Sequence, residues 1–372
     1  MKIFALKAKD PAIELIRIIA CLLVIFAHSQ FAVVIGGQLS KGLLGVSTLV
    51  ADDVPLFLLV TGFFFFNRVT SDQEIGKTFV YRAKSFLTSI YIPTIIYILI
   101  SILYSRFASP VDGFVPKDWG YLGHFVFMLL PGDHLWYVCT YLSFVFFFPM
   151  FAFLCQDKPE RNKMRRILLA VAIGGAVVAD VQYFFRMVLL DVDKFLWGYC
   201  TIFLILGYEL SLLMKKENLS KLKLGLAGLA MYLLSFSLKY GLQTYMFNQF
   251  GFVENRYRWL QTSLCFASAV GLFLVIYSLG SLIKKGGILA YVINFLGSCT
   301  FAIYLFHQLV ISRTLQWRYE ILAYFGNGSS ELGCFAYYIC YGGIVFLISL
   351  GIGFVFKMTL DTVLRSFPFR KK

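Results

Sequence analysis

The chain has 372 residues, of which 59% are hydrophobic and 18% aromatic, whereas only 15% are charged. Soluble domains contain about 45–50% apolar and about 25% charged residues, so this composition excludes an ordinary soluble protein and predicts an integral membrane protein. The net charge of +14 would suit a nucleic-acid partner, but the positions of the basic residues indicate membrane topology instead.

About ten apolar runs are long enough to cross a bilayer. No linker, soluble segment or internal repeat separates them, which predicts one all-α polytopic membrane domain over residues 1–372. Pro93 and Pro149 lie inside the third and fourth runs and should kink them. The runs are 12–35, 50–67, 85–105, 135–155, 167–187, 195–214, 222–242, 259–283, 288–312 and 335–357.

Basic residues are distributed unevenly over the two sides of these spans. Of the 34 Lys and Arg residues, 23 lie in the two termini or in connections on the same side of the membrane as the termini. Ten fall on the opposite side, Lys239 among them, and Arg17 lies within the first span. Because cytoplasmic loops carry the excess of Lys and Arg, we expect cytoplasmic N- and C-termini and an even number of spans.

The first apolar run carries three ionisable residues. Glu14 lies three residues before Arg17, so the two can pair on one helix face. His28 follows Arg17 by eleven residues, which places it on the same face, about 16 Å further along the axis. Ionisable groups within a membrane usually face a protein interior or a wet cavity. This pattern predicts an ionic anchor near the start of the span and a proton-transfer group in its far half.

Two other histidines lie towards the outer side in the predicted orientation. His307, with Tyr304 one turn before it, is near the outer end of the ninth run, at a depth similar to that of His28. His134 and Trp136 precede and begin the fourth run, at the predicted outer membrane surface. An imidazole in an apolar span can also merely bond a neighbouring helix, and the 134–136 segment can be a simple interfacial turn.

The predicted cytoplasmic side offers a second basic group. Arg82 and Lys84 begin the third run, and with Arg17 they would form a basic mouth, although each can also serve only as a topology anchor. The eight cysteines show no CxxC or Cys/His ligand spacing. We therefore expect neither a metal site nor a disulfide framework.

Four stretches resemble, in matching order, motifs of the integral-membrane acyltransferase-3 family. They are the Arg17-to-His28 spacing, VPLFLLVTGFFFF (54–66), HLWYVCTYL (134–142) and FAIYLFHQLV (301–310), and the resemblance covers nearly the whole chain. One departure concerns the third run, where the family often has two arginines three residues apart. This chain has Arg82 at the first position and Ser85 at the second.

The resemblance implies a membrane O-acyltransferase that moves an acyl group, in most members acetyl, from cytoplasmic acyl-CoA to a hydroxyl of a surface or lipid-linked polysaccharide. His28 would be the general base, since imidazole exchanges protons near neutral pH. His307 would orient the acceptor or stabilise the oxyanion. Arg17, Arg82 and Lys84 would bind the phosphates of CoA.

The expected partners are acyl-CoA (acetyl-CoA) as co-substrate, the glycan or lipid-linked saccharide acceptor and membrane lipid. No bound cofactor, metal or nucleic acid is expected, and the location is the cell (plasma or inner) membrane, which the chain crosses many times. The residues expected to support the site are Glu14, Tyr304, His134 and Trp136.

Two other classes of function fit a chain with this many spans. A lipid-linked saccharide flippase or transporter would also carry buried ionisable residues, although such proteins tend to show corresponding broken helices in two halves. A sensor or assembly protein of a polysaccharide export complex would make no demand for His28. Turnover of acyl-CoA by the purified protein separates the three classes.

Overall fold

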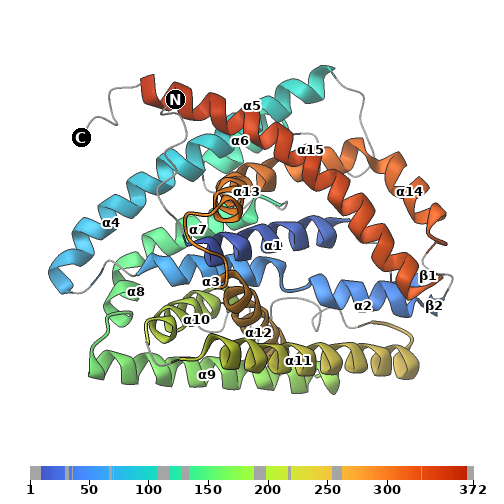
Figure 1. Ribbon diagram of the computed structural model, residues 1–372, viewed down its shortest axis with the longest axis horizontal. Helices are drawn as coiled ribbons and strands as arrows, with labels where there is room; N and C mark the ends of the chain where they lie inside the picture. The colour runs from blue at the N-terminus through green and yellow to red at the C-terminus, as the bar shows by residue number, and fades with distance from the viewer. Residues whose placement is uncertain are drawn as a thin grey trace.

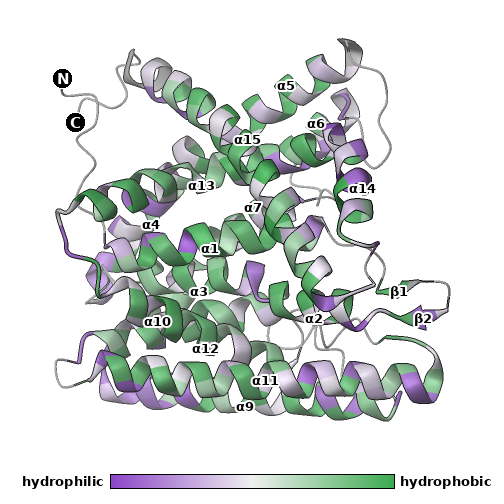
Figure 2. Cartoon of the chain, turned by 45° about the vertical axis from the view of Figure 1, so that its right-hand side comes forward, coloured by the Kyte–Doolittle hydropathy of each residue, from purple (hydrophilic) through white to green (hydrophobic). Residues whose placement is uncertain are grey.

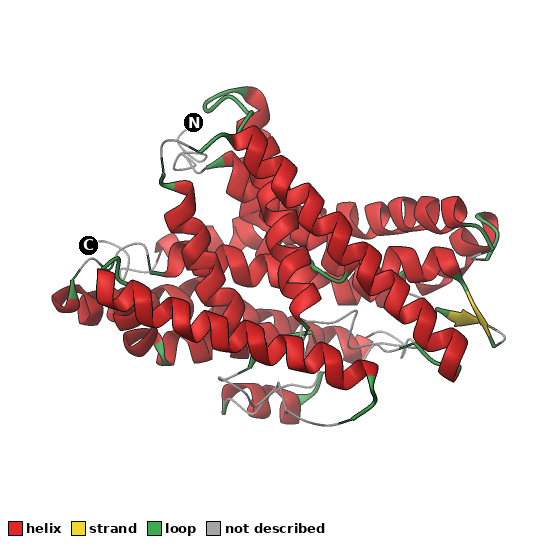
Figure 3. Ribbon diagram, turned by 90° about the horizontal axis from the view of Figure 1, so that it is seen from below, coloured by secondary structure: helices red, strands yellow, loops and turns green. Residues whose placement is uncertain are grey.

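A computed structural model describes residues 10–29, 33–35, 37–66, 69, 71–107, 117–127, 134–187, 198–216, 219–253, 262–327 and 329–366. Within these ranges the chain is almost entirely helical, with a single two-stranded hairpin (Figure 3). The N-terminal Lys2, Lys7 and Lys9 and the basic C-terminal tail, which entered the topology prediction, lie outside the described residues.

The elements follow one another as α-helices with few interruptions. They are α1 (Pro11–His28), β1 (Val34–Ile35), β2 (Gln38–Leu39), α2 (Lys41–Val50), α3 (Asp53–Phe65), α4 (Asp72–Phe86), the π-helix η1 (Leu87–Tyr91), α5 (Ile92–Phe107), α6 (Trp119–Val126), α7 (Trp136–Phe146), α8 (Phe148–Leu154), α9 (Pro159–Phe184), α10 (Tyr199–Met214), α11 (Lys221–Phe250), α12 (Ser263–Gly280), α13 (Ile288–Arg313), α14 (Leu315–Tyr324) and α15 (Glu331–Ser366).

Eight helical segments of the described chain are long and apolar enough to span a membrane, α2–α3 and α4–α5 each counted as one. The bent pair α7–α8 makes up to nine, and α10 is apolar but only 16 residues long. Each of the ten predicted runs coincides with one of these segments, so the protein is an all-α, multi-pass membrane protein. The count of ten spans and the cytoplasmic termini stay predictions.

The first span is shorter than the sequence indicates. Asp10 caps α1 by accepting a hydrogen bond from the Ala12 N–H (3.0 Å), with Pro11 at the first helical position. The helix ends at His28, not at residue 35, because the chain turns into the hairpin in which Val34 pairs with Leu39. His28 therefore stands at the end of its helix, where its side chain can leave the helix packing.

Both predicted proline kinks correspond to irregular backbone. The π-helical turn Leu87–Tyr91 lies immediately before Pro93, which cannot donate the helical hydrogen bond that its neighbours make. Pro149 lies in the first turn of α8, and the axes of α7 and α8 differ by 66°. The first turn of α7 contacts α13, where the ring centroids of Tyr137 and Tyr304 lie 6.1 Å apart.

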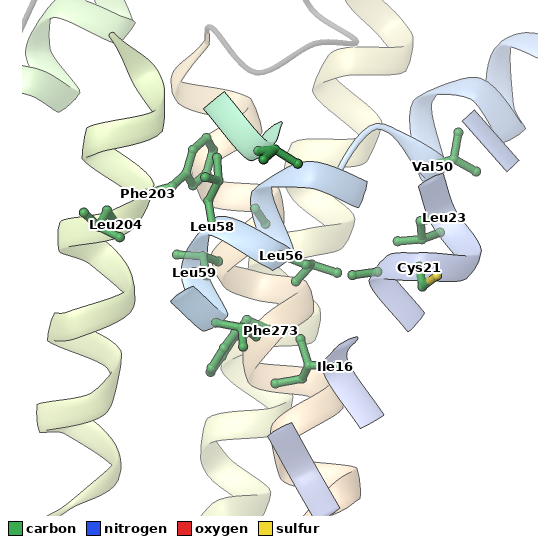
Figure 4. Packing of buried hydrophobic residues seen from close by; sticks show 14 of the residues in the cluster. Ile16, Cys21, Leu23, Val50, Leu56, Leu58, Leu59, Phe203, Leu204 and Phe273 are labelled. Atoms are coloured by element: carbon green, nitrogen blue, oxygen red, sulfur yellow. The ribbon is translucent and has the colours of Figure 1, made fainter. Parts of the chain in front are cut away.

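The core is built around α1 and α3, which Figure 1 shows in the middle of the molecule, with α9 and α11 along one side and α4, α5 and α15 along the other. Figure 2 shows the central helices as mostly hydrophobic, and Figure 4 shows Ile16, Cys21 and Leu56 among the packed side chains. Helices α3 and α10 touch at Gly62 and Gly207, where any side chain would overlap a backbone carbonyl of the other helix.

Candidate active site

One end of the candidate site is the ionic pair on α1. The guanidinium of Arg17 donates to Glu14 Oε1 at 3.0 Å, as the three-residue spacing predicts. Glu14 is 3% exposed and packs against Gly297 of α13, where a side chain would overlap its carboxylate. Arg17 keeps 31% of its surface and lies over the ring of Phe64 of α3, at 5.8 Å. Its charge thus stays partly available to a ligand at this end of the bundle.

Arg82 contacts the same end of α3. Its Nη2 donates to the carbonyls of Phe64 (2.6 Å) and Phe65 (3.0 Å), which are the free carbonyls of a helix C-terminus. Arg17 and Arg82 therefore both contact the last turn of α3. Lys84 is exposed, and no contact among the described residues joins it to either arginine.

Three histidines from three distant segments meet at the other end of α1. The ring centroid of His307 on α13 lies 5.1 Å from that of His28 and 5.4 Å from that of His134, which lies two residues before the start of α7. His307 is fully buried and His134 is 8% exposed, whereas His28 is exposed. No three His, Cys, Asp or Glu side chains in the described ranges are arranged to hold a metal ion.

The hydrogen bonds of His307 define its tautomer. Its Nδ1 lies 2.6 Å from the carbonyl oxygen of Tyr304, and since a carbonyl only accepts, Nδ1 carries the hydrogen. The neutral ring then has a lone pair on Nε2. This nitrogen is buried and has no hydrogen-bond partner among the residues that the structure describes. A buried polar atom without a partner is costly and points to a ligand or to chemistry.

His134 and Tyr304 hold the cluster together. The Tyr304 hydroxyl donates to the backbone carbonyl of His134, and His134 Nε2 lies 3.3 Å from the carbonyl of Leu305. The ring of Tyr97 on α5 packs edge-on against His134, 5.9 Å away. His134 thus lies in the turn before α7 and its side chain is buried in the cluster, whereas Trp136 begins α7 and is half-buried beside Tyr137.

Polar and aromatic side chains connect the two ends. The Tyr137 hydroxyl lies 2.9 Å from Thr61 Oγ1 of α3, and its ring is 6.1 Å from that of Tyr304. Thr61 lies three residues before Phe64, which contacts Arg17. Thr61, Tyr137 and Tyr304 are all only half-buried although they lie between helices. These three side chains thus form a partly accessible connection between the arginine end and the histidine end.

Two polar groups inside the molecule have partners that the sequence does not reveal. Tyr137 belongs to the 134–142 motif, but an isolated tyrosine gives no sign of its partner Thr61. Lys239 was counted with the connections, yet it lies in α11, is fully buried and pairs with Asp52 (3.6 Å). The predicted span ended near residue 242, and α11 continues to Phe250, which places Lys239 well inside the helix.

Comparison with known proteins adds the family. No curated protein and no solved structure matches the chain. The family model described as an acyltransferase domain, acyltransferase-3, matches residues 10–357, from the cap of α1 to the last turns of α15. All four motif stretches, and every residue of the arginine and histidine ends, lie within this match. The chain therefore belongs to the acyltransferase-3 family of membrane acyltransferases.

Proposed function

We propose that the protein is an O-acyltransferase that moves an acyl group, acetyl in the first instance, from cytoplasmic acyl-CoA to a hydroxyl of a surface or lipid-linked polysaccharide. Family membership supports acyl transfer. The observation that carries the proposal is the unpartnered Nε2 of buried His307 beside the exposed ring of His28. These two imidazoles supply a proton acceptor where a sugar hydroxyl needs one.

The chemistry follows from the tautomer of His307. The acceptor hydroxyl gives its proton to an imidazole nitrogen while its oxygen attacks the thioester carbonyl and forms the new C–O bond. The tetrahedral intermediate then breaks its C–S bond, and the imidazolium returns the proton to the departing CoA thiolate. A neutral His307 with its hydrogen on Nδ1 accepts a proton at Nε2 but has no N–H there to stabilise an oxyanion. The histidine pair therefore acts as base and orienter of the acceptor.

The donor side of the proposal rests on the opposite end of α1. Arg17 is partly exposed next to the last turn of α3, and its positive charge suits a phosphate of CoA. The eleven residues to His28 span about 16 Å along the helix, a length that the extended pantetheine arm can bridge. In the predicted orientation, the nucleotide part of the donor stays on the cytoplasmic side and the thioester meets the acceptor within the membrane.

Label transfer by purified protein tests this function. Detergent-solubilised protein is incubated with acetyl-CoA labelled in the acetyl group and with polysaccharide isolated from the surface of the source cell. We expect release of the CoA thiol and base-labile label in the polysaccharide. Absence of both, with an otherwise folded protein that moves a lipid-linked saccharide between the leaflets of vesicles, would support the transporter alternative and refute acyl transfer.

A further inference from the structure

A second charged site lies away from the histidines, between α9 and α10. A pocket of about 540 Å³ is floored by leucines of α10 and by Val270 of α12. Four cationic side chains line it, namely Arg165, Arg166, Lys215 and Lys216, against two carboxylates, Asp157 and Glu209. The lining thus carries an excess of positive charge over a hydrophobic floor.

Hydrogen bonds show which of these cations belong to the fold. Arg165 is 1% exposed and donates to Glu209 (2.7 Å), to the carbonyl of Leu154 (2.9 Å) and to Asn162 (2.8 Å). It also stacks on the ring of Tyr208, at 4.8 Å. This arginine neutralises Glu209 and fixes α9 against α10, so it has no capacity left for a ligand.

Arg166 and Lys216 differ from Arg165 in exposure and in hydrogen bonding. Both side chains are exposed, and neither makes a hydrogen bond or an ion pair with another residue in the described part of the chain. Asp157, the other carboxylate, accepts from Asn162 at 2.8 Å. Among the described residues, therefore, no carboxylate pairs with Arg166 or Lys216, and the ligand of the pocket should be an anion.

The position of the pocket selects the kind of anion. It lies at the start of α9 and the end of α10, the end that is cytoplasmic by the distribution of basic residues. Arg166 also lines a neighbouring hollow of about 580 Å³ that includes Ile167. From Ile167 onward, one face of α9 is apolar and exposed: Ile167 and Val171 expose 54% and 49% of their surface. Cations at the edge of an exposed apolar stripe match a phospholipid, whose phosphate and chains are continuous.

We infer that this pocket binds the headgroup phosphate of an anionic phospholipid from the adjacent leaflet, with the acyl chains along α9. Basic pockets between transmembrane helices on the cytoplasmic side are suited to such headgroups. The lipid would hold α9 and α10 together at the membrane surface. The inference is independent of the proposed acyl transfer, because neither Arg166 nor Lys216 belongs to the arginine or the histidine end.

Lipid binding by the whole protein provides the test. The parent and the double variant Arg166→Gln/Lys216→Gln are titrated in detergent with phosphatidylglycerol and with phosphatidylcholine, with native mass spectrometry and thermal unfolding as readouts. At about 1 kcal/mol for each basic residue, the double variant should bind phosphatidylglycerol roughly 30-fold more weakly. Both proteins should bind phosphatidylcholine equally, and acetyl-CoA turnover should not change.

A control variant and a soluble competitor complete the experiment. Lys77→Gln/Lys284→Gln removes two exposed lysines from the same predicted side but outside the pocket, and it should bind phosphatidylglycerol like the parent. An equal loss of phosphatidylglycerol binding in both double variants, or no loss in either, overturns the inference. Displacement of phosphatidylglycerol by millimolar inorganic phosphate or CoA, with stabilisation by either alone, would show a site for soluble phosphates and would also overturn it.

Discussion

Two buried polar clusters lie inside this membrane protein, and they differ in how their charges are balanced. At the break between α2 and α3, Ser268 donates to Asp52 Oδ1 (2.6 Å) and accepts from Lys239 (2.9 Å). Gln243, one turn beyond Lys239, donates to Thr48 at 3.1 Å. All five side chains are at most 1% exposed. A cation and an anion are matched here, although Asp52 Oδ2 has no partner among the described residues.

In the histidine cluster, by contrast, no carboxylate of the described residues forms an ion pair with His28 or His307. Its backbone contacts fix two of the rings, yet His307 Nε2 has no described partner and His28 is exposed. Matched charges in a membrane interior hold helices together, and here they attach the peripheral α11 to the α2–α3 break. A buried base that is fixed but has no described partner costs stability, as expected for a group kept for chemistry. The comparison therefore indicates a structural role for the first cluster and supports the proposed reactivity of the second.

The largest expected effect is loss of turnover on removal of either histidine. His28→Ala and His307→Ala should each lower acetyl transfer by about 10²–10⁴-fold, because general-base assistance is worth that much. Their thermal unfolding should stay close to that of the parent. His124→Ala, which removes an exposed histidine of α6, is the matched control. Near-parent turnover in both site variants would contradict the role assigned to the pair.

Lys239→Met should lower stability and leave turnover unchanged, the opposite of the histidine variants. It leaves the buried Asp52 without its counter-charge, which costs about 3–5 kcal/mol in buried pairs. We expect a lower midpoint of thermal unfolding in detergent and a normal rate per folded molecule. The double variant Asp52→Leu/Lys239→Met should recover much of the stability. Loss of turnover in a stably folded double variant would mean that this cluster also takes part in the reaction.

Arginine variants extend the comparison to the donor end. Arg17→Ala should raise the KM for acetyl-CoA about tenfold, the effect of losing one charged contact of about 1.4 kcal/mol. It should also lower stability, because buried Glu14 loses its ion pair with Arg17. Arg82→Ala should lower stability by about 1–3 kcal/mol, since it leaves two carbonyls of α3 without their donor, but should change KM little. Steady-state kinetics and thermal unfolding of both variants separate the two roles. A common effect on KM would restore Arg82 to the donor site.

The smallest effect is expected for Tyr137, which lies between the arginine end and the histidine end. Tyr137→Phe removes the hydroxyl that bonds Thr61 but keeps the ring beside Tyr304, so stability should fall by only about 0.5–1.5 kcal/mol. A double-mutant cycle with Thr61→Val measures the coupling. A large loss of turnover instead would place the Tyr137 hydroxyl among the groups that touch substrate.

Much of the local architecture follows from the sequence. The ten apolar runs, the bend at Pro149 and the Glu14–Arg17 pair were all predicted, since each depends on residues close together in the chain. The spacing of Arg17 and His28 likewise places them along one helix without tertiary information. The family resemblance, which also rests on order along the chain, is confirmed over residues 10–357. The roles of the site residues stay proposals.

Only the tertiary structure decided which distant groups meet. The rings of His134, in the turn before α7, and His307, on α13, lie 5.4 Å apart because Tyr304 and Leu305 of α13 bond this turn. Asp52 and Lys239 find each other across 186 intervening residues. A hydropathy pattern states that a helix lies in the membrane, but not which of its faces meets which neighbour. That choice depends on close packing, as at Gly62 and Gly207, and packing is a property of the whole bundle.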